Sequence, residues 1–333
     1  MTDFAELLDL ASARLGGRVL AANDEFFAPK ENLLKPEEPV FLPDEYTDRG
    51  KWMDGWETRR RREPGHDWCI LRLGVPGRVA GVVVDTRHFK GNYPEACSVD
   101  ACATEGDPGP EELLREASWT EVLARSPLAG DAPNPFPLRG AERVTHLRLN
   151  IFPDGGVARL RAYGQAMPDW ERLAGGGGEV DLAAAENGGL VVASSDMFFG
   201  SRHNLIFPGP PLGMHDGWET RRRRGPGHDW AIVRFARPGA IDRVTVDTTH
   251  FKGNAPGSCS VDVCDAGAGP GAAVPPESAP WRALLPGVPL RAHEVHEFDQ
   301  ELEAAGIASH ARLNIYPDGG VARLRLWGRI ARP

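Results

Sequence analysis

RLNIFPDGGVARLR, residues 148–161, is the stretch of the chain that decides the fold. Apolar and polar residues alternate before a Pro-Asp-Gly-Gly turn and again after it. Alternation with a period of two is typical of a half-buried β-strand, and two such runs around an Asp-Gly turn predict a β-hairpin. The apolar positions are Leu147, Leu149, Ile151, Ala158, Leu160 and Ala162, and the intervening ones are His146, Arg148, Asn150, Arg159, Arg161 and Tyr163.

The same stretch returns as RLNIYPDGGVARLR at residues 312–325, which indicates an internal duplication. Two more motifs recur, each 162 residues further on: DGWETRRRREPGHDW at 54–68 returns as DGWETRRRRGPGHDW, and VDTRHFKGN at 84–92 returns as VDTTHFKGN. A solenoid repeat spans only about 20–50 residues, so each copy is a whole domain. Because a glycine run at 175–178 suits a flexible linker, we predict domains at 18–170 and 180–333.

Short strands separated by turns dominate each copy. Further strands are expected at Ile70–Leu73, Val79–Asp85 and Cys97–Ala101, and the chain carries 39 glycines and 29 prolines. Helices are expected only at Pro110–Ala117 and at the N-terminus, where Phe4, Leu7, Leu8, Ala11 and Leu15 would share one face. The sequence therefore predicts an all-β fold of two tandem jelly-roll β-sandwich domains with a short N-terminal helix.

The order of these signals also resembles that of galactose-binding-like (discoidin-type) sandwiches. Such domains carry an early Asp-Gly element, then a tryptophan that leads a strand ending in Leu-Gly, and finally a strand ending in an aromatic residue and Gly. Asp54-Gly55, Trp68–Gly74, Tyr163-Gly164 and Trp327-Gly328 match that order. The resemblance implies a galactose-binding-like sandwich in each copy.

Charge and composition exclude several classes of protein. The 333 residues include 38 Lys plus Arg against 47 Asp plus Glu, a net charge of −9, which argues against a protein that coats nucleic acid. No apolar run approaches the roughly 20 residues that span a bilayer, and the acidic start does not suit a secretory signal, so no membrane partner and a cytoplasmic location are expected. The five cysteines include no C-x-x-C pair, which favours buried, reduced thiols.

Polar residues gather where strands are expected to end, in the loops that usually carry function. Four consecutive arginines, 59–62, offer either planar forks for a carboxylate or ion-paired scaffolding. Histidine titrates near neutral pH and suits acid–base chemistry, whereas Lys90-Gly91-Asn92 suits either a turn or a ligand contact. No P-loop, dinucleotide fingerprint or nucleophile elbow is present.

Together the three repeated motifs resemble those of the allantoicase (allantoate amidinohydrolase) family over most of the chain, roughly 18–165 and 190–329. The resemblance implies two jelly-roll repeats, hydrolysis of allantoate to ureidoglycolate and urea in purine (allantoin) degradation, and a homo-oligomer. Allantoate carries a carboxylate and two ureido groups, which arginine and asparagine side chains can bind. Releasing urea needs an acid–base group to move protons, and histidine or a carboxylate can do this.

These considerations yield a set of candidate residues in both copies. We predict that the catalytic acid or base is among Glu57, His66, His88, Glu219, His228 and His250. We predict substrate binding by Arg59, Arg61, Lys90, Asn92, Arg148, Asn150, Lys252, Asn254, Arg312 and Asn314. No metal site and no cofactor are predicted; a divalent cation is compatible with the Asp and His residues, but no motif supports it.

Two questions stay open on the sequence alone. The copies differ at Arg87 against Thr249, Tyr93 against Ala255, Glu63 against Gly225 and Phe152 against Tyr316. The sequence therefore leaves open whether both copies are active, or whether the chain has one site or a site between domains or subunits. The alternatives to an enzyme are a non-catalytic module that binds a carbohydrate or a small acid, and a scaffold whose polar motifs are all salt bridges. A neutral sugar does not require this density of charge, which favours the enzyme.

Overall fold

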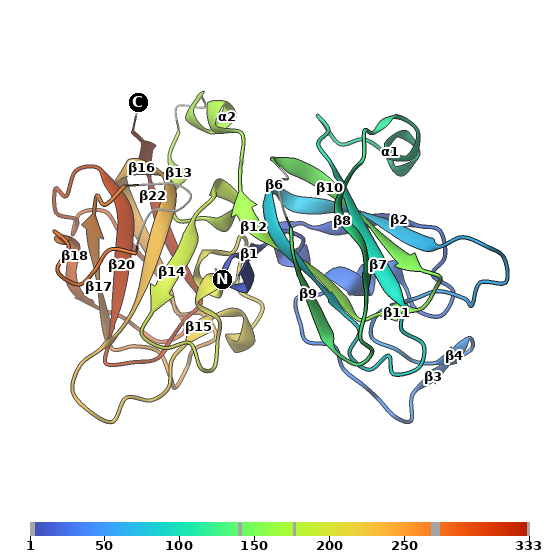
Figure 1. Ribbon diagram of the computed structural model, residues 1–333. Helices are drawn as coiled ribbons and strands as arrows, with labels where there is room; N and C mark the ends of the chain where they lie inside the picture. The colour runs from blue at the N-terminus through green and yellow to red at the C-terminus, as the bar shows by residue number, and fades with distance from the viewer. Residues whose placement is uncertain (1–3, 139–141, 176–177, 268–273, 332–333) are drawn as a thin grey trace. The chain divides into compact units, whose positions relative to one another are not determined.

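The computed structural model describes residues 4–138, 142–175, 178–267 and 274–331, and the chain separates into two compact units, Met1–Met167 and Pro168–Pro333 (Figure 1). Each unit is a mostly antiparallel β domain, and corresponding strands follow in the same order in both. Within the described residues, no helix has the length and apolar character needed to cross a membrane.

The described residues of the first unit form twelve strands and one short α-helix. Strand β6 is by far the longest, and three 3₁₀ turns lie at Phe4–Glu6, Ala13–Leu15 and Lys30–Leu34. The elements are β1 (Leu8–Asp9), β2 (Arg18–Ala22), β3 (Tyr46–Thr47), β4 (Gly50–Lys51), β5 (Trp56–Glu57), β6 (Asp67–Asp85), β7 (Ala96–Cys102), α1 (Pro110–Glu116), β8 (Thr120–Pro127), β9 (Pro133–Pro137), β10 (Val144–Phe152), β11 (Gly156–Val157) and β12 (Arg159–Ala166).

The second unit repeats this arrangement but has no described counterpart of α1, β3 or β4. Its 3₁₀ turns lie at Ala185–Asn187, Arg202–Ile206 and Met214–Asp216. The elements are α2 (Trp170–Gly175), β13 (Val180–Asp181), β14 (Leu190–Ser194), β15 (Trp218–Glu219), β16 (Asp229–Asp247), β17 (Ser258–Cys264), β18 (Arg282–Pro289), β19 (Val295–Phe298), β20 (Ala308–Tyr316), β21 (Gly320–Val321) and β22 (Arg323–Ile330).

Strand β6 joins the two halves of the first sandwich. Its first part pairs with β2 and β10, and its last part pairs with β12 and β9, so one strand contributes to both groups. Strand β10 then pairs with β7, and β7 with β8. The expected strands at 70–73 and 79–85 are thus parts of one strand, and the all-β sandwich fold is confirmed in both units.

The hairpin expected around residues 153–156 is wrong, although both of its strands exist. Strand β10 pairs with β6 and β7, whereas β12 pairs with β1 and β6, so the connection passes from one half of the sandwich to the other. On the way, β11 forms a small separate sheet with β5. An Asp-Gly turn allows a tight reversal of the chain but does not by itself pair the two strands that it connects. Here β10 and β12 each pair with the long strand β6 and not with each other.

The expected amphipathic helix at the N-terminus is also wrong. Two 3₁₀ turns flank the two-residue strand β1, and Leu8, Ala11 and Leu15 are buried even so. Sheet pairing of Leu8 with Gly164 fixes this segment in an extended conformation, which overrides local helix propensity. The helix expected at 110–117 is confirmed as α1, Pro110–Glu116.

Alternation along β10 predicts the buried face but not what covers the other face. Leu147, Leu149 and Ile151 have no exposed surface, as expected. His146, on the opposite face, is equally inaccessible. Leu113 of α1 packs with Ile70 and Cys102 on that face, close to the position where Cys102 pairs with His146, so the helix region covers this end of the outer face.

Candidate active site

Parts of the three repeated motifs of the first unit meet at the end of the sandwich where β10 passes to β12. There, Gly156 of β11 pairs with Glu57 of β5 and donates its N–H to the carbonyl of Asn92, at 2.7 Å. A Cβ atom on Gly156 would lie 2.0 Å from the Phe89 ring. The glycine therefore permits the loop after β6 to press directly on β11, which brings Asn92 to Glu57.

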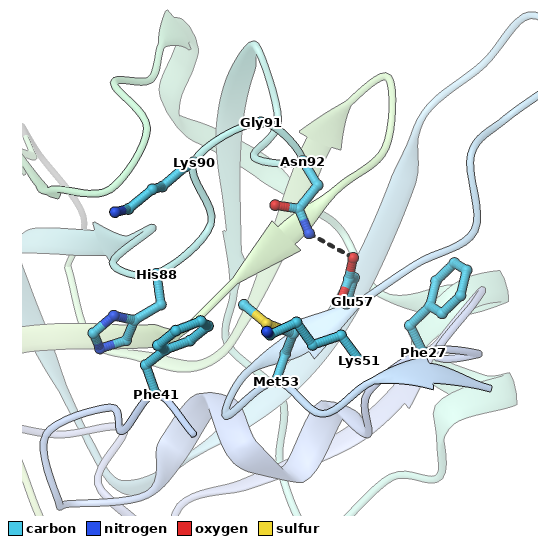
Figure 2. Close-up of a pocket in the computed structure, with 9 residues that line it drawn as sticks. All are labelled: Phe27, Phe41, Lys51, Met53, Glu57, His88, Lys90, Gly91 and Asn92. Atoms are coloured by element: carbon cyan, nitrogen blue, oxygen red, sulfur yellow. Dashed lines mark hydrogen bonds between the residues drawn. The ribbon is translucent and has the colours of Figure 1, made fainter. Parts of the chain in front are cut away.

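A pocket of about 430 Å³ opens at this junction, within the usual size range for small-molecule sites (Figure 2). Four of the predicted residues line it, and five further residues complete it. The lining residues are Phe27, Phe41, Lys51, Met53, Glu57, His88, Lys90, Gly91 and Asn92. Figure 2 shows Lys90, Gly91 and Asn92 across the pocket from Phe41, Met53 and Lys51.

Glu57 is the acid–base group best placed in this pocket. Asn92 Nδ2 donates to Glu57 Oε1 at 2.7 Å, the contact drawn in Figure 2, and holds the carboxylate toward the loop. Burial raises the pKa of Glu57 above its ordinary value of 4.5, because desolvation outweighs the opposing effect of the Asn92 hydrogen bond. A carboxyl group with a raised pKa is a stronger base once ionised, as acid–base catalysis requires.

His88 lines the same pocket in a strained backbone conformation. Its φ is 73°, and the Asp131 carboxylate accepts its backbone N–H at 2.8 Å. The ring stacks on Phe41, with centroids 5.7 Å apart, and its Nε2 lies 3.0 Å from the Pro39 carbonyl oxygen. That carbonyl can only accept, so Nε2 carries a proton. The geometry suits a residue that shapes the pocket wall.

The second unit repeats these contacts. Asn254 Nδ2 donates to Glu219 Oε1 at 2.6 Å, and His250 has a φ of 74° with its Nε2 3.0 Å from the Pro211 carbonyl oxygen. Lys252 follows His250 in the same loop as Lys90 follows His88. Both copies thus bring the predicted glutamate and asparagine together, although they are 35 residues apart in the sequence.

Arg148 and Asn150 lie elsewhere, on the outer face of the β10–β7 pair. Both donate to Asp100 Oδ2 at 2.9 Å, and Arg148 also lies over the Trp119 ring at 4.9 Å. His66 contacts Phe152, with ring centroids 4.8 Å apart, rather than the Glu57 pocket. The same network recurs in the second unit, where Arg312 and Asn314 bind Asp262, and there His228 Nε2 also lies 3.2 Å from Asn314 Oδ1.

The arginine run is ion-paired at alternate positions. Arg59 pairs with Asp24 at 2.6 Å, and Arg61 with the buried Asp67 at 2.6 Å. In the second unit Arg221 pairs with Asp196, and Arg223 with Asp229. These contacts match the scaffold interpretation of the run, which the sequence left open beside the anion-binding one.

One buried ion pair near the pocket was missed by the sequence reasoning. Arg159 and Asp54 are both nearly inaccessible, and their side chains meet at 2.6 Å; Arg323 and Asp216 repeat the pair at 2.9 Å. Both residues lie inside repeated motifs, and that repetition is the one feature of the sequence that points to them. The alternating pattern predicts Arg159 on the polar face of a strand, whereas its side chain is buried.

In the described part of the chain, no group of three or more His, Cys, Asp or Glu side chains is arranged to hold a metal ion. The polar groups at the pocket are instead a carboxylate, an amide, an imidazole and two ammonium groups. Such a set can bind an anionic, amide-bearing molecule and move a proton within it.

Comparison with known proteins assigns the family. Residues 8–167 and 180–331 each match the allantoicase repeat. The chain is 51% identical to a probable allantoicase of Pseudomonas aeruginosa, covering 99% of this chain and 98% of that protein, and 51% identical to a second from Burkholderia pseudomallei, covering 97% and 95%. This chain belongs to the allantoicase family.

A solved structure supports the same assignment. Crystalline allantoicase from Saccharomyces cerevisiae superposes with a TM-score of 0.81 at 35% identity, covering 97% of this chain and 93% of that one. The family resemblance inferred from the motifs is therefore confirmed. As an allantoicase, the protein is a hydrolase of linear amidine carbon–nitrogen bonds that acts on allantoate in purine degradation.

Proposed function

We propose that the pocket around Glu57 is where the chain hydrolyses allantoate to ureidoglycolate and urea, with Glu57 as the acid–base group. The observation that carries the proposal is the hydrogen bond between the half-buried Glu57 and Asn92 in a pocket of small-molecule size. The raised pKa of the Glu57 carboxyl supports the same role. The carboxylate and amide of the pair match the proton-bearing ureido groups of allantoate in hydrogen-bonding character.

The reaction breaks one bond between the central carbon of allantoate and a ureido nitrogen. In the proposed sequence, ionised Glu57 accepts the N–H proton of the ureido group that stays, whose nitrogen forms a double bond to the central carbon. The bond to the other ureido group breaks, and Glu57 returns the proton to that leaving nitrogen, which departs as urea. Water then adds across the C=N bond, hydroxyl to carbon and hydrogen to nitrogen, to yield ureidoglycolate.

The neighbouring residues then have distinct roles. Asn92 occupies one oxygen of Glu57, so the other oxygen is left to meet the substrate proton. His88 forms part of the wall through its contacts with Phe41 and Pro39, and we assign it a positioning role. The predicted roles of His66, Arg148 and Asn150 in turnover stay predictions, since these residues meet in a separate network around Asp100.

The test is urea release from allantoate by the purified protein and by Glu57→Gln. We expect kcat to fall by about 100-fold or more, since general acid–base groups contribute roughly 10²–10⁴. Glu63→Gln, an exposed glutamate that is glycine in the second repeat, is the matched control and keeps full activity. Glu219→Gln reports whether the second repeat also turns over.

Two results would overturn parts of the proposal. Full activity in Glu57→Gln together with loss in Glu219→Gln would move the site to the second repeat. Allantoate binding without urea release by the unmodified chain would favour the non-catalytic module that binds a small acid. The family resemblance also implies a homo-oligomer, a proposal that light scattering on the purified chain tests directly.

A further inference from the structure

The first repeat carries an insertion beside the Glu57 pocket. Equivalent contacts in the two repeats mark its ends. In the first repeat, Val40 donates its N–H to Asp54, and the preceding Pro39 carbonyl contacts His88. In the second repeat, Leu212 donates its N–H to Asp216, and the preceding Pro211 carbonyl contacts His250. Between these points the first repeat has thirteen residues, 41–53, and the second has three, 213–215. The Glu57–Asn92 and His88–Pro39 contacts recur as Glu219–Asn254 and His250–Pro211, so the second repeat is an internal reference for what the insertion adds.

The insertion folds back as the hairpin β3–β4 and supplies a wall of the pocket. Tyr46 pairs with Lys51, and Phe41 and Lys51 both line the pocket. A Cβ on Gly50 would lie 3.6 Å from the Phe27 ring, so the hairpin also packs against that pocket residue. In the second repeat the counterpart of Phe27, Phe199, is 61% exposed.

Lys51 is held in this wall without an acidic partner. Its ammonium donates to the Pro43 carbonyl at 2.8 Å and lies 4.9 Å from the Phe41 ring centroid and 5.4 Å from that of Tyr46. Among the described residues, no carboxylate forms an ion pair with it. An ammonium has three donors, so at least one remains for a ligand in the pocket.

The other cation of the pocket is placed differently. Lys90 is 79% exposed and lies 3.8 Å from Asp131, a distance at which its charge is already partly compensated. In the second repeat, residues 213–215 take the place of 41–53, and these are glycine, methionine and histidine, with no lysine or arginine. Lys51 is thus the half-buried, uncompensated positive charge of the first pocket, and the second repeat has none at this position.

We propose that Lys51 binds the carboxylate of the substrate, and that this insertion makes the first repeat the one that selects a carboxylate-bearing ureido compound. The inference rests on the proposed function of the Glu57 pocket. Glu57 would repel a carboxylate placed close to it, whereas the Lys51 ammonium would attract one, so a carboxylate bound at Lys51 leaves the ureido groups to meet Glu57. Phe41 holds the ammonium in place through its ring face.

The test measures binding with two small probes rather than turnover. Ureidoacetate carries one carboxylate and one ureido group, and methylenediurea carries two ureido groups and no charge. In Lys51→Met we expect calorimetry to show about 10- to 100-fold weaker binding of ureidoacetate, as for loss of one charge-assisted hydrogen bond, and unchanged binding of methylenediurea. Lys51→Arg retains most of the affinity because it keeps the charge.

Two further variants act as controls. Arg49→Met removes a positive charge from the same hairpin; Arg49 contacts the Phe26 carbonyl and does not line the pocket, so probe binding should be unchanged. Replacing residues 41–53 by the three-residue connection 213–215 tests the whole insertion on a template that already folds in this chain. We expect this variant to lose affinity for ureidoacetate at least as strongly as Lys51→Met.

Three outcomes separate the possibilities. Unchanged ureidoacetate binding in Lys51→Met, with Glu57→Gln inactive, overturns the carboxylate assignment and leaves the proposed function standing. An equal loss for both probes also overturns it, because Lys51 would then act through packing. Active Glu57→Gln with selective loss of ureidoacetate binding in Lys51→Met keeps the carboxylate site and refutes the catalytic role of Glu57.

Discussion

At the scale of single residues, Glu57 combines a functional benefit with an energetic penalty. Burial raises its pKa, so the folded state favours the protonated form more than the unfolded state does. The ordinary pKa of a glutamate is 4.5, and the pKa of Glu57 lies above it. As the pH rises from 4.5 through the raised pKa, Glu57 ionises and the free energy of unfolding therefore falls. Glu57 weakens the fold at neutral pH, which is common for catalytic groups.

This predicts opposite effects of Glu57 on activity and on stability. The acid limb of kcat/KM for allantoate should have an apparent pKa above 4.5, because only ionised Glu57 can accept the proton. Glu57→Gln should be inactive yet at least as stable as the parent at pH 7, as measured by urea denaturation. A clear loss of stability in that variant would mean that Glu57 is primarily structural.

A second residue-scale prediction concerns the buried histidines His146 and His310. Both are fully inaccessible, and burial lowers the pKa of each to about 4 from an ordinary 6.5. The folded state therefore binds fewer protons than the unfolded state between these values, and stability falls as pH drops from 6.5 toward 4. Each histidine should contribute about 3 kcal/mol to that fall.

Thermal unfolding of the parent and of His146→Gln across pH 4–7 tests the second prediction. The variant is expected to lose less stability on acidification, because glutamine does not titrate. An identical slope in both proteins would show that carboxylates alone cause the acid unfolding. Thr145, whose hydroxyl lies 2.8 Å from His146 Nδ1, offers the glutamine a partner for one of its polar atoms.

At the scale of elements, the segment Phe152–Ala158 decides where the active-site residues meet. It leaves β10, pairs with β5 and enters β12, and Gly156 is the point of closest approach to the loop after β6. Its glycines therefore serve close backbone contact rather than a hairpin turn. Sequence patterning identifies the turn residues, but the contact with Phe89 exists only once the strands have been distributed between the two halves of the sandwich.

Gly156→Ala should reduce both activity and stability. Its Cβ would lie 2.0 Å from the Phe89 ring, so β11 and the Asn92 loop must separate, which disrupts the Glu57–Asn92 contact. We expect a loss of about 1–3 kcal/mol, as for overpacking, with a lower kcat in the allantoate assay. Gly225→Ala, where nothing lies within 4 Å of the added atom, is the matched control.

At the scale of the whole molecule, the two units have equivalent cores and differ at the rim of the pocket. Trp56 and Trp218 are both inaccessible, and each donates its ring N–H to an aspartate carbonyl at 2.8 Å. The difference at the rim of the pocket is the β3–β4 insertion, which is absent from the described part of the second unit. Duplication therefore preserved the framework, while the surface around each equivalent site is distinct.

Cysteine chemistry is a further property of the whole molecule. All five thiols are free and buried, and burial raises the pKa of Cys97 and of Cys259 to about 12. Thiolate, the reactive form, is thus almost absent at pH 8. A thiol reagent such as dithionitrobenzoate should label none of the five in the folded protein and all five in guanidinium; rapid labelling of the native state would contradict the burial.

The amino-acid sequence by itself determined the duplication, the strand character and the family, because these depend on local alternation and on long contiguous motifs. It also singled out Glu57, His88, Lys90 and Asn92, since polar residues repeated near strand ends stand out in one chain. Tertiary structure alone separated these four from Arg148, Asn150 and His66, because strand β6 assigns β10 and β12 to different halves of the sandwich. It alone also placed Lys51 in the pocket wall, since that contact depends on how the hairpin folds back and on no local pattern.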